Sequence, residues 1–547
     1  MTRMTGGQAI VEMLRRNGVD TIFVLPGVQN DALFAALYDA SEAGGKTALR
    51  VIHTRHEQAA AYMAFGYARA SGKCGAYAVV PGPGFLNTTA ALATAYATNA
   101  PVLCISGQIA SRMIGRGYGQ LHEIPDQLAI LRGLTKWAAH IYHPTETGIA
   151  VDEAFRQMQT GRPRPVGLEM PPDVMALETE VVLPEGFIAP APATPDPDLI
   201  EKAAERLGNS KNPLIMVGSG ASGAAEALLA VASLIEAPVF TSYGGKGIVS
   251  DRHYLSQNAF AGHELWGKAD VVLGVGSRMA HPLMQWGVDE ALDLIRIDID
   301  PTEIARIVAP SIGIVADARA ALTALHDALL RHNRKRPSRE AELTALKKKS
   351  LQEIGKLSPQ CQYLMAIRRE LPDEGVFVDE LTQVGYVARL AYPTYRPRTF
   401  IHSGYQGTLG FGFPTALGAK IARPEAPVVS ISGDGGFLYN AQELASAALH
   451  GIDIVAIVFV DGAFGNVRRI QKEDYGNRLI AVELRNPDFA RMAESYGVAG
   501  ISASGPEGLQ RELNAALKRR GPTLIEVKVG EMPDPWPVIL RPRVRGK

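Results

Sequence analysis

The sequence predicts an α/β protein that consists of three doubly wound domains, each built on a parallel sheet. Two observations support this fold class. Short apolar runs that end in glycine-containing turns alternate with helical patterns along most of the chain. The chain has 547 residues, 46% of them hydrophobic, which is enough to bury several cores and corresponds to about three domains.

Several apolar runs carry the strongest strand pattern. They are TIFVLPG, GAYAVVPGPG and APVLCISGQ near the N-terminus, NPLIMVGSG and ADVVLGVGS in the middle, and APVVSISGDG and DIVAIVFVDG in the last third. Parallel strands that are covered by helices on both faces are expected to be apolar along their whole length. These runs therefore predict parallel sheets.

Two breaks in this pattern divide the chain. One is the Pro- and Ala-rich stretch PEGFIAPAPATPDPDLI, and the other is the basic stretch RHNRKRPSREAELTALKKKS. They predict domains at residues 1–185, 195–335 and 355–547. The basic stretch lacks the interleaved aromatic residues of segments that bind nucleic acid. We therefore interpret it as a solvated helix face and expect no nucleic-acid partner.

Charge and cysteine content narrow the functional class. The 56 basic residues balance the 56 acidic ones, so a small-molecule enzyme fits better than a partner of nucleic acid or anionic membrane. Cys74, Cys104 and Cys361 are too few and too widely spaced for disulfides or a zinc site, which predicts core thiols in a reducing compartment. Residues 1–10 lack a secretory signal, and no apolar run of about 18 residues could span a bilayer. We expect a cytoplasmic protein without membrane contact.

Two acidic residues follow successive strands in the last third of the chain. The strand PVVSIS leads into Gly433-Asp434-Gly435-Gly436, and the strand IDIVAIVFV ends at Asp461. Ligands bind at the carboxyl edge of an open parallel sheet, and carboxylates there suit Mg²⁺ that holds a diphosphate. Gly435 and Gly436 expose backbone N–H groups to phosphate oxygens. Between the two strands, Asn440 and Glu443 are expected to form a capping box.

The stretch GDGGFLYNAQELASAALHGIDIVAIVFVDGAFGNVRRIQ resembles the metal and diphosphate motif of thiamine-diphosphate enzymes of the acetolactate synthase and pyruvate decarboxylase superfamily. That motif is Gly-Asp-Gly followed at about this spacing by Asn-Asn. The resemblance implies that Asp434, Asp461 and the backbone of Ala463 bind Mg²⁺ or Ca²⁺. The pair Val460-Asp461 replaces Asn-Asn, which adds one negative charge. Gly436 stands where the family often has Ser.

The N-terminal part resembles the pyrimidine-binding half of the same family. In VIHTRHEQAAAYMAFGYARASGK, the resemblance gives Glu57 the role of the Glu that hydrogen-bonds the aminopyrimidine of the cofactor. The competing interpretation is a capping box from Thr54 to Glu57. In PGPGFLNTTAALATAYATNAPVLCISGQ, it places Pro83 and Asn87 near the pyrimidine ring, although both residues also suit a turn and a helix cap.

The third domain supplies the remaining cofactor contacts that the resemblance implies. In SGYQGTLGFGFPTALGA, the carbonyl of Gly407 accepts the exocyclic amine, and Leu409 separates the two rings, where core packing is the alternative. Thr382 and Gln383 contact the diphosphate. The resemblance covers nearly the whole chain in the order pyrimidine-binding, central and diphosphate-binding domain. It implies a homodimer or homotetramer with active sites at the subunit interface.

A dinucleotide-dependent oxidoreductase is the main alternative from another class. The strand PLIMV leads into the fingerprint from Gly218 to Gly223. The fingerprint also requires an acidic residue at the end of the second strand, and APVFTSYGG has none there. The segment GVGSRMAHPLMQ matches the flavin segment of acetolactate synthases only in part, so we do not expect FAD.

The residues expected near the reacting carbon are Gln29, Gln108 and His122. A neutral His at position 122, where acetolactate synthases usually have Gln, could relay protons near pH 7. A surface loop is the alternative for His122. Asn466, Val467 and Ile470 occupy the segment of the second-substrate channel, and Ile470 replaces a family Trp.

The resemblance implies a decarboxylase or carboligase, thus a lyase or transferase, that acts on a 2-oxo acid or a 2-hydroxy ketone. An acyloin or 2-hydroxyacyl-CoA lyase of the same superfamily is the alternative, and the intact Glu57 argues against a non-catalytic relative. The sequence does not distinguish the acyl donor, the acceptor or the handedness of the product.

Overall fold

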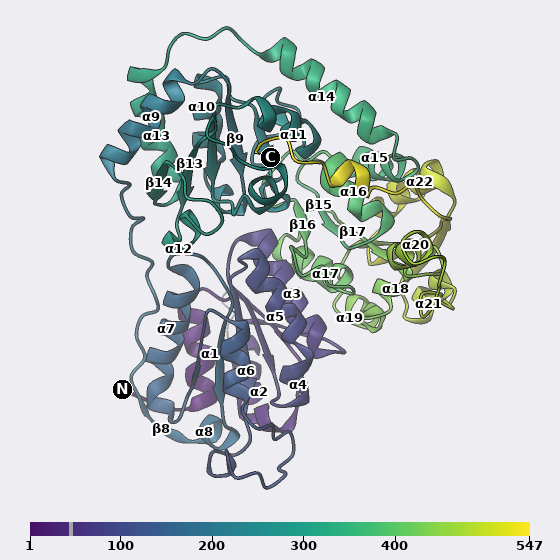
Figure 1. The fold of residues 1–547 in the computed structure, drawn as a ribbon. Helices are drawn as coiled ribbons and strands as arrows, with labels where there is room; N and C mark the ends of the chain where they lie inside the picture. The colour runs from purple at the N-terminus through teal and green to yellow at the C-terminus, as the bar shows by residue number, and fades with distance from the viewer. Residues whose placement is uncertain (43–47, 547) are drawn as a thin grey trace.

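The computed structural model describes residues 1–42 and 48–546. This part of the chain forms three six-stranded sheets, within which all neighbouring strands are parallel. Helices flank each sheet, and the central domain lies above the first domain and beside the third in Figure 1. The predicted fold class, an α/β protein with three parallel-sheet domains, is confirmed.

The first sheet has the strand order β3-β2-β4-β5-β7-β6. Its strands are β2 (Thr21–Val24), β3 (Arg50–His53), β4 (Gly75–Val79), β5 (Val102–Gly107), β6 (Trp137–His140) and β7 (Val166–Met170). The accompanying helices are α1 (Gly6–Arg16), α2 (Asp31–Glu42), α3 (Glu57–Ser71), α4 (Pro83–Asn87), α5 (Thr89–Thr98), α6 (Gln127–Leu134), α7 (Thr147–Gln159) and α8 (Pro172–Ala176). An antiparallel pair joins β1 (Thr2–Thr5) to β8 (Glu178–Val181).

The central sheet has the strand order β11-β10-β9-β12-β13-β14. Its strands are β9 (Pro213–Val217), β10 (Val239–Thr241), β11 (Ser256–Gln257), β12 (Val271–Val275), β13 (Asp293–Asp298) and β14 (Ile312–Val315). The accompanying helices are α9 (Pro197–Asn209), α10 (Ala225–Leu234), α11 (Ala259–Lys268), α12 (Pro301–Ile304) and α13 (Ala318–His332). Helix α14 (Glu340–Gly355) leads from this domain to the third (Figure 1).

The third sheet has the strand order β16-β15-β17-β18-β20-β19. Its strands are β15 (Val376–Asp379), β16 (Phe400–His402), β17 (Val428–Gly433), β18 (Val455–Val460), β19 (Ala499–Ala503) and β20 (Thr523–Lys528). The accompanying helices are α15 (Gln360–Glu370), α16 (Gln383–Ala391), α17 (Gly412–Ala422), α18 (Asp434–Phe437), α19 (Leu444–Leu449), α20 (Gly465–Glu473), α21 (Phe489–Ser495), α22 (Gly505–Lys518) and α23 (Trp536–Ile539).

Local sequence explains where several of these elements begin. Asp196 accepts hydrogen bonds from the backbone of Asp198 and Leu199 at the start of α9, and Asp317 has the same role at the start of α13. Strands β4 and β5 are buried along their whole length, as expected for parallel strands between helices. The apolar runs and the capping residues therefore set the element order.

Helices α3 and α17 pack closely and join the first domain to the third (Figure 1). A Cβ added to Gly66 of α3 would enter the backbone carbonyl of Thr415, and one added to Gly418 of α17 would enter that of Met63. Glycine therefore allows the two helix backbones to approach each other. The side chains around this contact belong to one hydrophobic core that both domains share.

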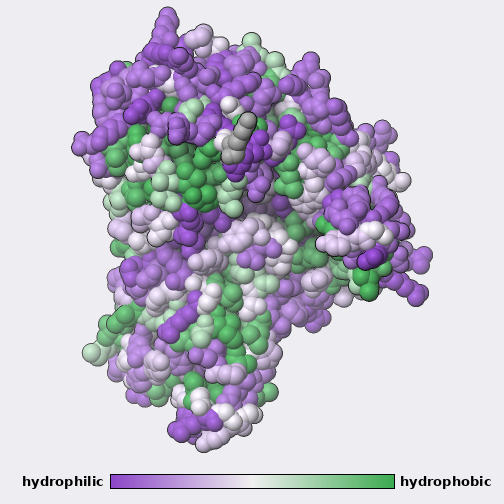
Figure 2. Space-filling view, in the orientation of Figure 1, coloured by the Kyte–Doolittle hydropathy of each residue, from purple (hydrophilic) through white to green (hydrophobic). Residues whose placement is uncertain are grey.

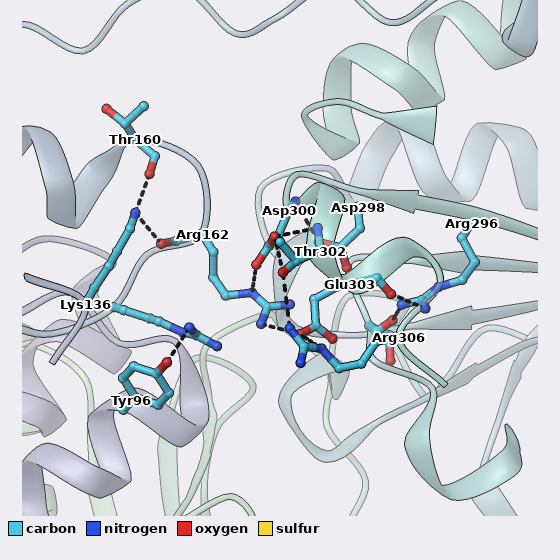
Figure 3. Close-up of polar contacts among 12 residues, drawn as sticks. Tyr96, Lys136, Thr160, Arg162, Arg296, Asp298, Asp300, Thr302, Glu303 and Arg306 are labelled. Atoms are coloured by element: carbon cyan, nitrogen blue, oxygen red, sulfur yellow. Dashed lines mark hydrogen bonds and ion pairs between the residues drawn. The ribbon is translucent and has the colours of Figure 1, made fainter. Parts of the chain in front are cut away.

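A buried ion network joins the first domain to the central one (Figure 3). The side chain of Arg162, from the loop after α7, donates to Glu303 Oε1 at 3.0 Å and lies 3.5 Å from Asp300 Oδ2. Arg306 also pairs with Glu303, whose backbone carbonyl accepts from Arg296. Because Arg162 is only 9% exposed, its two carboxylate partners are needed to offset the cost of burying its charge.

The chain crosses back from the third domain to the central domain after α23 (Figure 1). The backbone N–H groups of Val544 and Arg545 donate to the carbonyl of Trp286. The buried guanidinium of Arg545 donates to the carbonyl of Trp266 at 2.7 Å and pairs with Asp289 at 2.7 Å. Residues distant in sequence thus complete one side of the central domain.

Hydrophilic residues dominate the face seen in Figure 2, with smaller apolar areas between them. Among the described residues, no helix has the length and apolar character needed to cross a bilayer. Cys104 is buried as predicted, whereas Cys74 and Cys361 are only partly buried at the edges of cores; all three are free thiols. Burial raises the pKa of Cys74 and Cys104 to about 12 and that of Cys361 to about 11.

We predict that Gly418→Ala destabilises the protein by about 1–3 kcal/mol, because the new methyl group forces α17 away from α3. Thermal unfolding followed by circular dichroism checks this prediction. The matched control is Gly508→Ala in α22, where an added Cβ meets no atom of the described residues within 4 Å and no stability should be lost. Equal unfolding midpoints for both variants would contradict the role given to this packing.

Candidate active site

Three neighbouring strands of the third sheet end at the predicted diphosphate site. Strand β17 lies between β15 and β18, and all three run parallel. Thr382 follows β15, Asp434 follows β17, and Asp461 follows β18. An added Cβ at Gly433 would lie 3.7 Å from the Thr382 methyl group, so the first two loops are in contact. The carboxyl edge of the sheet thus gathers these segments, as an open parallel sheet does around ligands.

Asp434 is buried and accepts several hydrogen bonds. Its Oδ1 accepts from the backbone of Gly435 at 2.9 Å, and its Oδ2 accepts from the backbone of Gly462 at 2.8 Å and from Asn486 Nδ2 at 2.6 Å. The side-chain oxygen of Asn486 is buried and has no partner among the described residues. A bound cation or a hydrogen-bond donor would satisfy this oxygen.

Asp461 faces the same site. The N–H of Gly462, the residue after Asp461, donates to Asp434 Oδ2, so the loops that carry the two carboxylates adjoin. Burial raises the pKa of Asp461, and the negative charge of Asp434 raises it further. A Cβ added to Gly465 would approach Asp461 Oδ2 and would lie 2.8 Å from Gln383 Nε2. The space at Gly465 is therefore a small cradle between a carboxylate and an amide. This donor set fits a divalent cation with a phosphate group beside it.

Thr382 is less available to a phosphate than Gln383. Thr382 caps α16, and its hydroxyl oxygen accepts from the backbone of Gly385 at 2.7 Å. Gly435 and Gly436 lie in the first turn of α18, and a Cβ at Gly435 would contact the ring of Phe464. Ala463 donates its N–H to Asp461 Oδ1 at 3.1 Å, which leaves its carbonyl as the group predicted to bind metal. The described residues contain no cluster of three or more acidic, His or Cys side chains of the kind that hold a metal alone.

The predicted ring-separating segment connects β16 to α17. Gly407 has φ +58, and Leu409 is half-buried rather than part of the core. The hydroxyl oxygens of Thr408 and Thr94 lie 3.1 Å apart, so this segment also contacts α5 of the first domain.

Glu57 is the first residue of α3 and is half-buried. Its Oε2 accepts a hydrogen bond from Asn87 Nδ2 at 2.9 Å. The helix is capped by His56, whose Nδ1 accepts from the backbone of Gln58. The capping box from Thr54 to Glu57 therefore does not form. Pro83, the first residue of α4, is exposed.

Two polar contacts connect the start of α3 to the third domain. Asn440 Nδ2 donates to Gln58 Oε1 at 3.0 Å and to the carbonyl of Gly410 at 2.6 Å. Glu443 is buried, and its two carboxylate oxygens accept from the backbone of Arg55 at 3.1 and 3.2 Å. The predicted capping box of Asn440 and Glu443 is therefore wrong, because both side chains have distant partners instead.

Gln29 and His122 lie together. The Nδ1 of His122 is 3.1 Å from Gln29 Oε1, and Gln29 Nε2 donates to the carbonyl of Leu121 at 3.1 Å. A Cβ added to Gly82 would enter the backbone carbonyl of His122, so this pair adjoins the turn that precedes Pro83. His122 has φ +69, which is uncommon for a residue with a side chain.

Gln108 belongs to a different, buried network. Its Nε2 lies 3.4 Å from Glu169 Oε2, which also accepts from Gln127 at 2.9 Å. Gln127 Oε1 accepts from the backbone of Gly82 at 2.9 Å, and the other oxygen of Glu169 lies 2.8 Å from His140 Nδ1. Gln127 and Glu169 were not predicted as site residues, because no local motif marks residues whose partners lie on other elements.

The residues expected in the second-substrate channel lie on α20. Asn466 Oδ1 accepts a hydrogen bond from Trp536 Nε1 at 2.8 Å. Val467 is exposed, and Ile470 is half-buried. Asn466, Trp536 and Gly407 also line a cavity of about 910 Å³ that residues of all three domains enclose.

The Gly218–Gly223 loop lines the same cavity from the central domain. A Cβ at Gly218 would enter the carbonyl of Gly276, and one at Gly220 would lie 2.8 Å from the Cα of Gly276. Glycine is therefore required because the turns after β9 and β12 touch each other. This packing accounts for Gly218 and Gly220 without a dinucleotide, whereas an added Cβ at Gly223 would make only an ordinary contact with Arg319 at 3.8 Å.

Comparison with known protein families identifies all three parts of the chain. Residues 4–130 match the N-terminal TPP binding domain of thiamine pyrophosphate enzymes, residues 200–325 match the central domain, and residues 381–527 match the C-terminal TPP binding domain.

Full-length relatives support the same assignment. The chain is 34% identical to the protein named "Probable 2-ketoarginine decarboxylase AruI" of Pseudomonas aeruginosa, with 96% of this chain and 94% of the relative covered. It is 36% identical to the "Probable acetolactate synthase large subunit" of Methanocaldococcus jannaschii, with 96% and 92% covered. It is 32% identical to the acetolactate synthase large subunit of Haemophilus influenzae, with 99% and 97% covered. The chain therefore belongs to the thiamine pyrophosphate enzyme family and is an acetolactate synthase-like, thiamine-diphosphate-dependent enzyme.

Proposed function

We propose that this protein uses thiamine diphosphate and Mg²⁺ to decarboxylate a 2-oxo acid, or to make or break the carbon–carbon bond beside the carbonyl of a 2-hydroxy ketone. The observation that carries the proposal is the convergence of Thr382, Asp434 and Asp461 at the ends of three adjacent parallel strands. Two carboxylates at one edge of an open parallel sheet suit a divalent cation that holds a phosphate group.

In this proposal Asp434, Asp461 and the carbonyl of Ala463 hold the metal ion. Gln383, Gly435 and Gly436 bind the diphosphate, with Thr382 shaping the loop. The carbonyl of Gly407 and the side chain of Leu409 contact the rings. When bound, thiamine diphosphate supplies a nucleophilic carbon that adds to a carbonyl and accepts the electron pair of the broken bond.

Glu57 exchanges a proton with the aminopyrimidine in this proposal. Asn87 holds one of its oxygens by donating to Oε2, which leaves Oε1 for the ligand. Pro83 and Asn87 are exposed on this chain, as suits residues that serve a site completed by a second subunit. We therefore propose a homodimer or homotetramer, with the active sites between subunits.

Gln29 and His122 are proposed to face the substrate. Their side chains are in contact, so His122 can take or give a proton while Gln29 orients its ring. Gln108 is given an indirect role, because its amide is directed toward Glu169. We further propose that the domains span residues 1–185, 195–335 and 355–547 and that the protein is cytoplasmic.

The relatives suggest which substrates to test. One relative is named for 2-ketoarginine and others for acetolactate, so the panel contains 2-ketoarginine and pyruvate, together with benzoylformate and benzoin. The purified protein is incubated with Mg²⁺ and thiamine diphosphate, and CO₂ release and products are followed by NMR. Turnover of any member assigns the reaction. The absence of both cofactor binding and turnover would refute the proposal.

We predict that Glu57→Gln lowers turnover by at least about 100-fold, because an amide cannot exchange a proton with the cofactor. Binding of thiamine diphosphate, measured by calorimetry, should change much less. Glu153→Gln on α7 is the control, since Glu153 forms an exposed ion pair with Arg156. Full activity of Glu57→Gln would show that another group moves the proton.

We predict that Asp461→Asn binds thiamine diphosphate at least as tightly as the wild type at saturating Mg²⁺. The amide keeps an oxygen ligand and removes a charge that burial first, and the repulsion from Asp434 second, disfavour, as the raised pKa of Asp461 indicates. Asp434→Asn should weaken binding by about tenfold or more, because Asp434 accepts hydrogen bonds on both oxygens. Calorimetry with and without EDTA measures both variants. The opposite order of affinities would remove Asp434 from the centre of the metal site.

A further inference from the structure

Glu380 is a buried carboxylate that lies directly after β15. It is 1% exposed, and three donors surround it. Its Oε1 accepts from the backbone of Gly410 at 2.8 Å, and its Oε2 accepts from the backbone of Gly412 at 2.8 Å and from Ser432 Oγ at 3.1 Å. Among the described residues, its hydrogen-bond partners are these three donors, and none of them is a cationic side chain.

These three bonds connect parts of the predicted cofactor site that the chain keeps apart. Gly410 directly follows Leu409, and Gly412 is the first residue of α17. Ser432 lies near the end of β17, two residues before Asp434. One carboxylate therefore holds the segment that contacts the rings against the strand that leads to the metal and the diphosphate.

Glu380 also accounts for the glycine at position 436, where the family often has Ser. A Cβ added to Gly436 would enter Glu380 Oε1, and one added to Gly412 would lie 2.7 Å from Oε2. Both glycines are thus packed against the carboxylate. A Ser at position 436 would therefore clash with the Glu380 carboxylate in its present position.

Such a burial is expensive. Burial raises the pKa of Glu380 to about 7, although the bonds from Gly410, Gly412 and Ser432 oppose the rise. A buried acid without a cationic partner costs more free energy than an apolar or amide side chain in the same place. The three hydrogen bonds from Gly410, Gly412 and Ser432 offset part of this cost, and they join the segments that are predicted to bind the cofactor.

We propose that Glu380 is a positioning residue that locks the segment carrying Gly407 and Leu409 onto the strand before Asp434, so that the ring-contacting and diphosphate-binding parts of the site keep a fixed separation. This inference rests on the proposed function. It predicts that Glu380 acts on cofactor binding through backbone geometry, without touching the cofactor.

The test is Glu380→Gln, in which the amide presents hydrogens to one of the two glycine N–H groups that the carboxylate now satisfies. Thiamine diphosphate should bind about tenfold more weakly to this variant at saturating Mg²⁺. In the protein without cofactor, hydrogen exchange followed by mass spectrometry should speed up in the segment from 404 to 414. The substrate KM should change little.

The matched control is Glu526→Gln on β20 of the same sheet. Glu526 is also 1% exposed, and it accepts a backbone hydrogen bond from Phe489 at 2.8 Å, but it contacts no predicted cofactor residue. Glu526→Gln should lower the unfolding midpoint about as much as Glu380→Gln does and leave the affinity for thiamine diphosphate unchanged. If both variants weaken cofactor binding equally, Glu380 has only a structural role and the inference is wrong.

A second set of variants tests the contact with Gly436. Gly436→Ser should weaken cofactor binding in the wild-type background and cause a smaller further loss in Glu380→Ala, where space is available. Additive losses would overturn the inference. If the wild type binds no thiamine diphosphate, the proposed function fails and the inference fails with it. If the wild type binds the cofactor and the variants bind it equally well, only the inference fails.

Discussion

The close packing of α3 against α17 fixes the relative placement of the two sets of predicted site residues that one chain contributes. Both helices start at predicted site segments: α3 begins with Glu57, and α17 begins three residues after Leu409. Because glycines bring the two backbones together, the helix starts cannot move independently. The polar contacts of Asn440 and Glu443 add to this packing at the same end of α3. The first and third domains of one chain are therefore held together at the start of α3.

Buried acids concentrate at one edge of the third sheet. Asp379 ends β15, Glu380 follows it, and Asp434 lies beyond the neighbouring strand. Burial raises the pKa of Asp379 to about 8, partly relieved by Arg389 and Lys246. Glu380 and Asp434 instead accept hydrogen bonds from glycine N–H groups, so backbone donors stabilise these two carboxylates. The negative charge of the carboxylates at this sheet edge favours the binding of a divalent cation.

Much of the fold followed from local pattern, and part of the site did too. Apolar runs that end in glycine predicted the strands, and the ends of two of these strands predicted that Asp434 and Asp461 lie at the same sheet edge. The actual partner of Glu443 could not be predicted in this way, since the backbone N–H that it binds is 388 residues away. Glu380 was missed for a related reason: its donors are glycine N–H groups, which leave no side-chain signature.

The return of the chain to the central domain limits how modular this protein is. Gly287 packs so tightly on the backbone of Arg545 that an added Cβ would enter its carbonyl, and His263 hydrogen-bonds to the carbonyl of Pro542. A fragment cut at the linkers on either side of the central sheet would expose this surface. A central domain exchanged between relatives would thus need to carry residues 541–546 with it, although these residues are not contiguous with it in the chain.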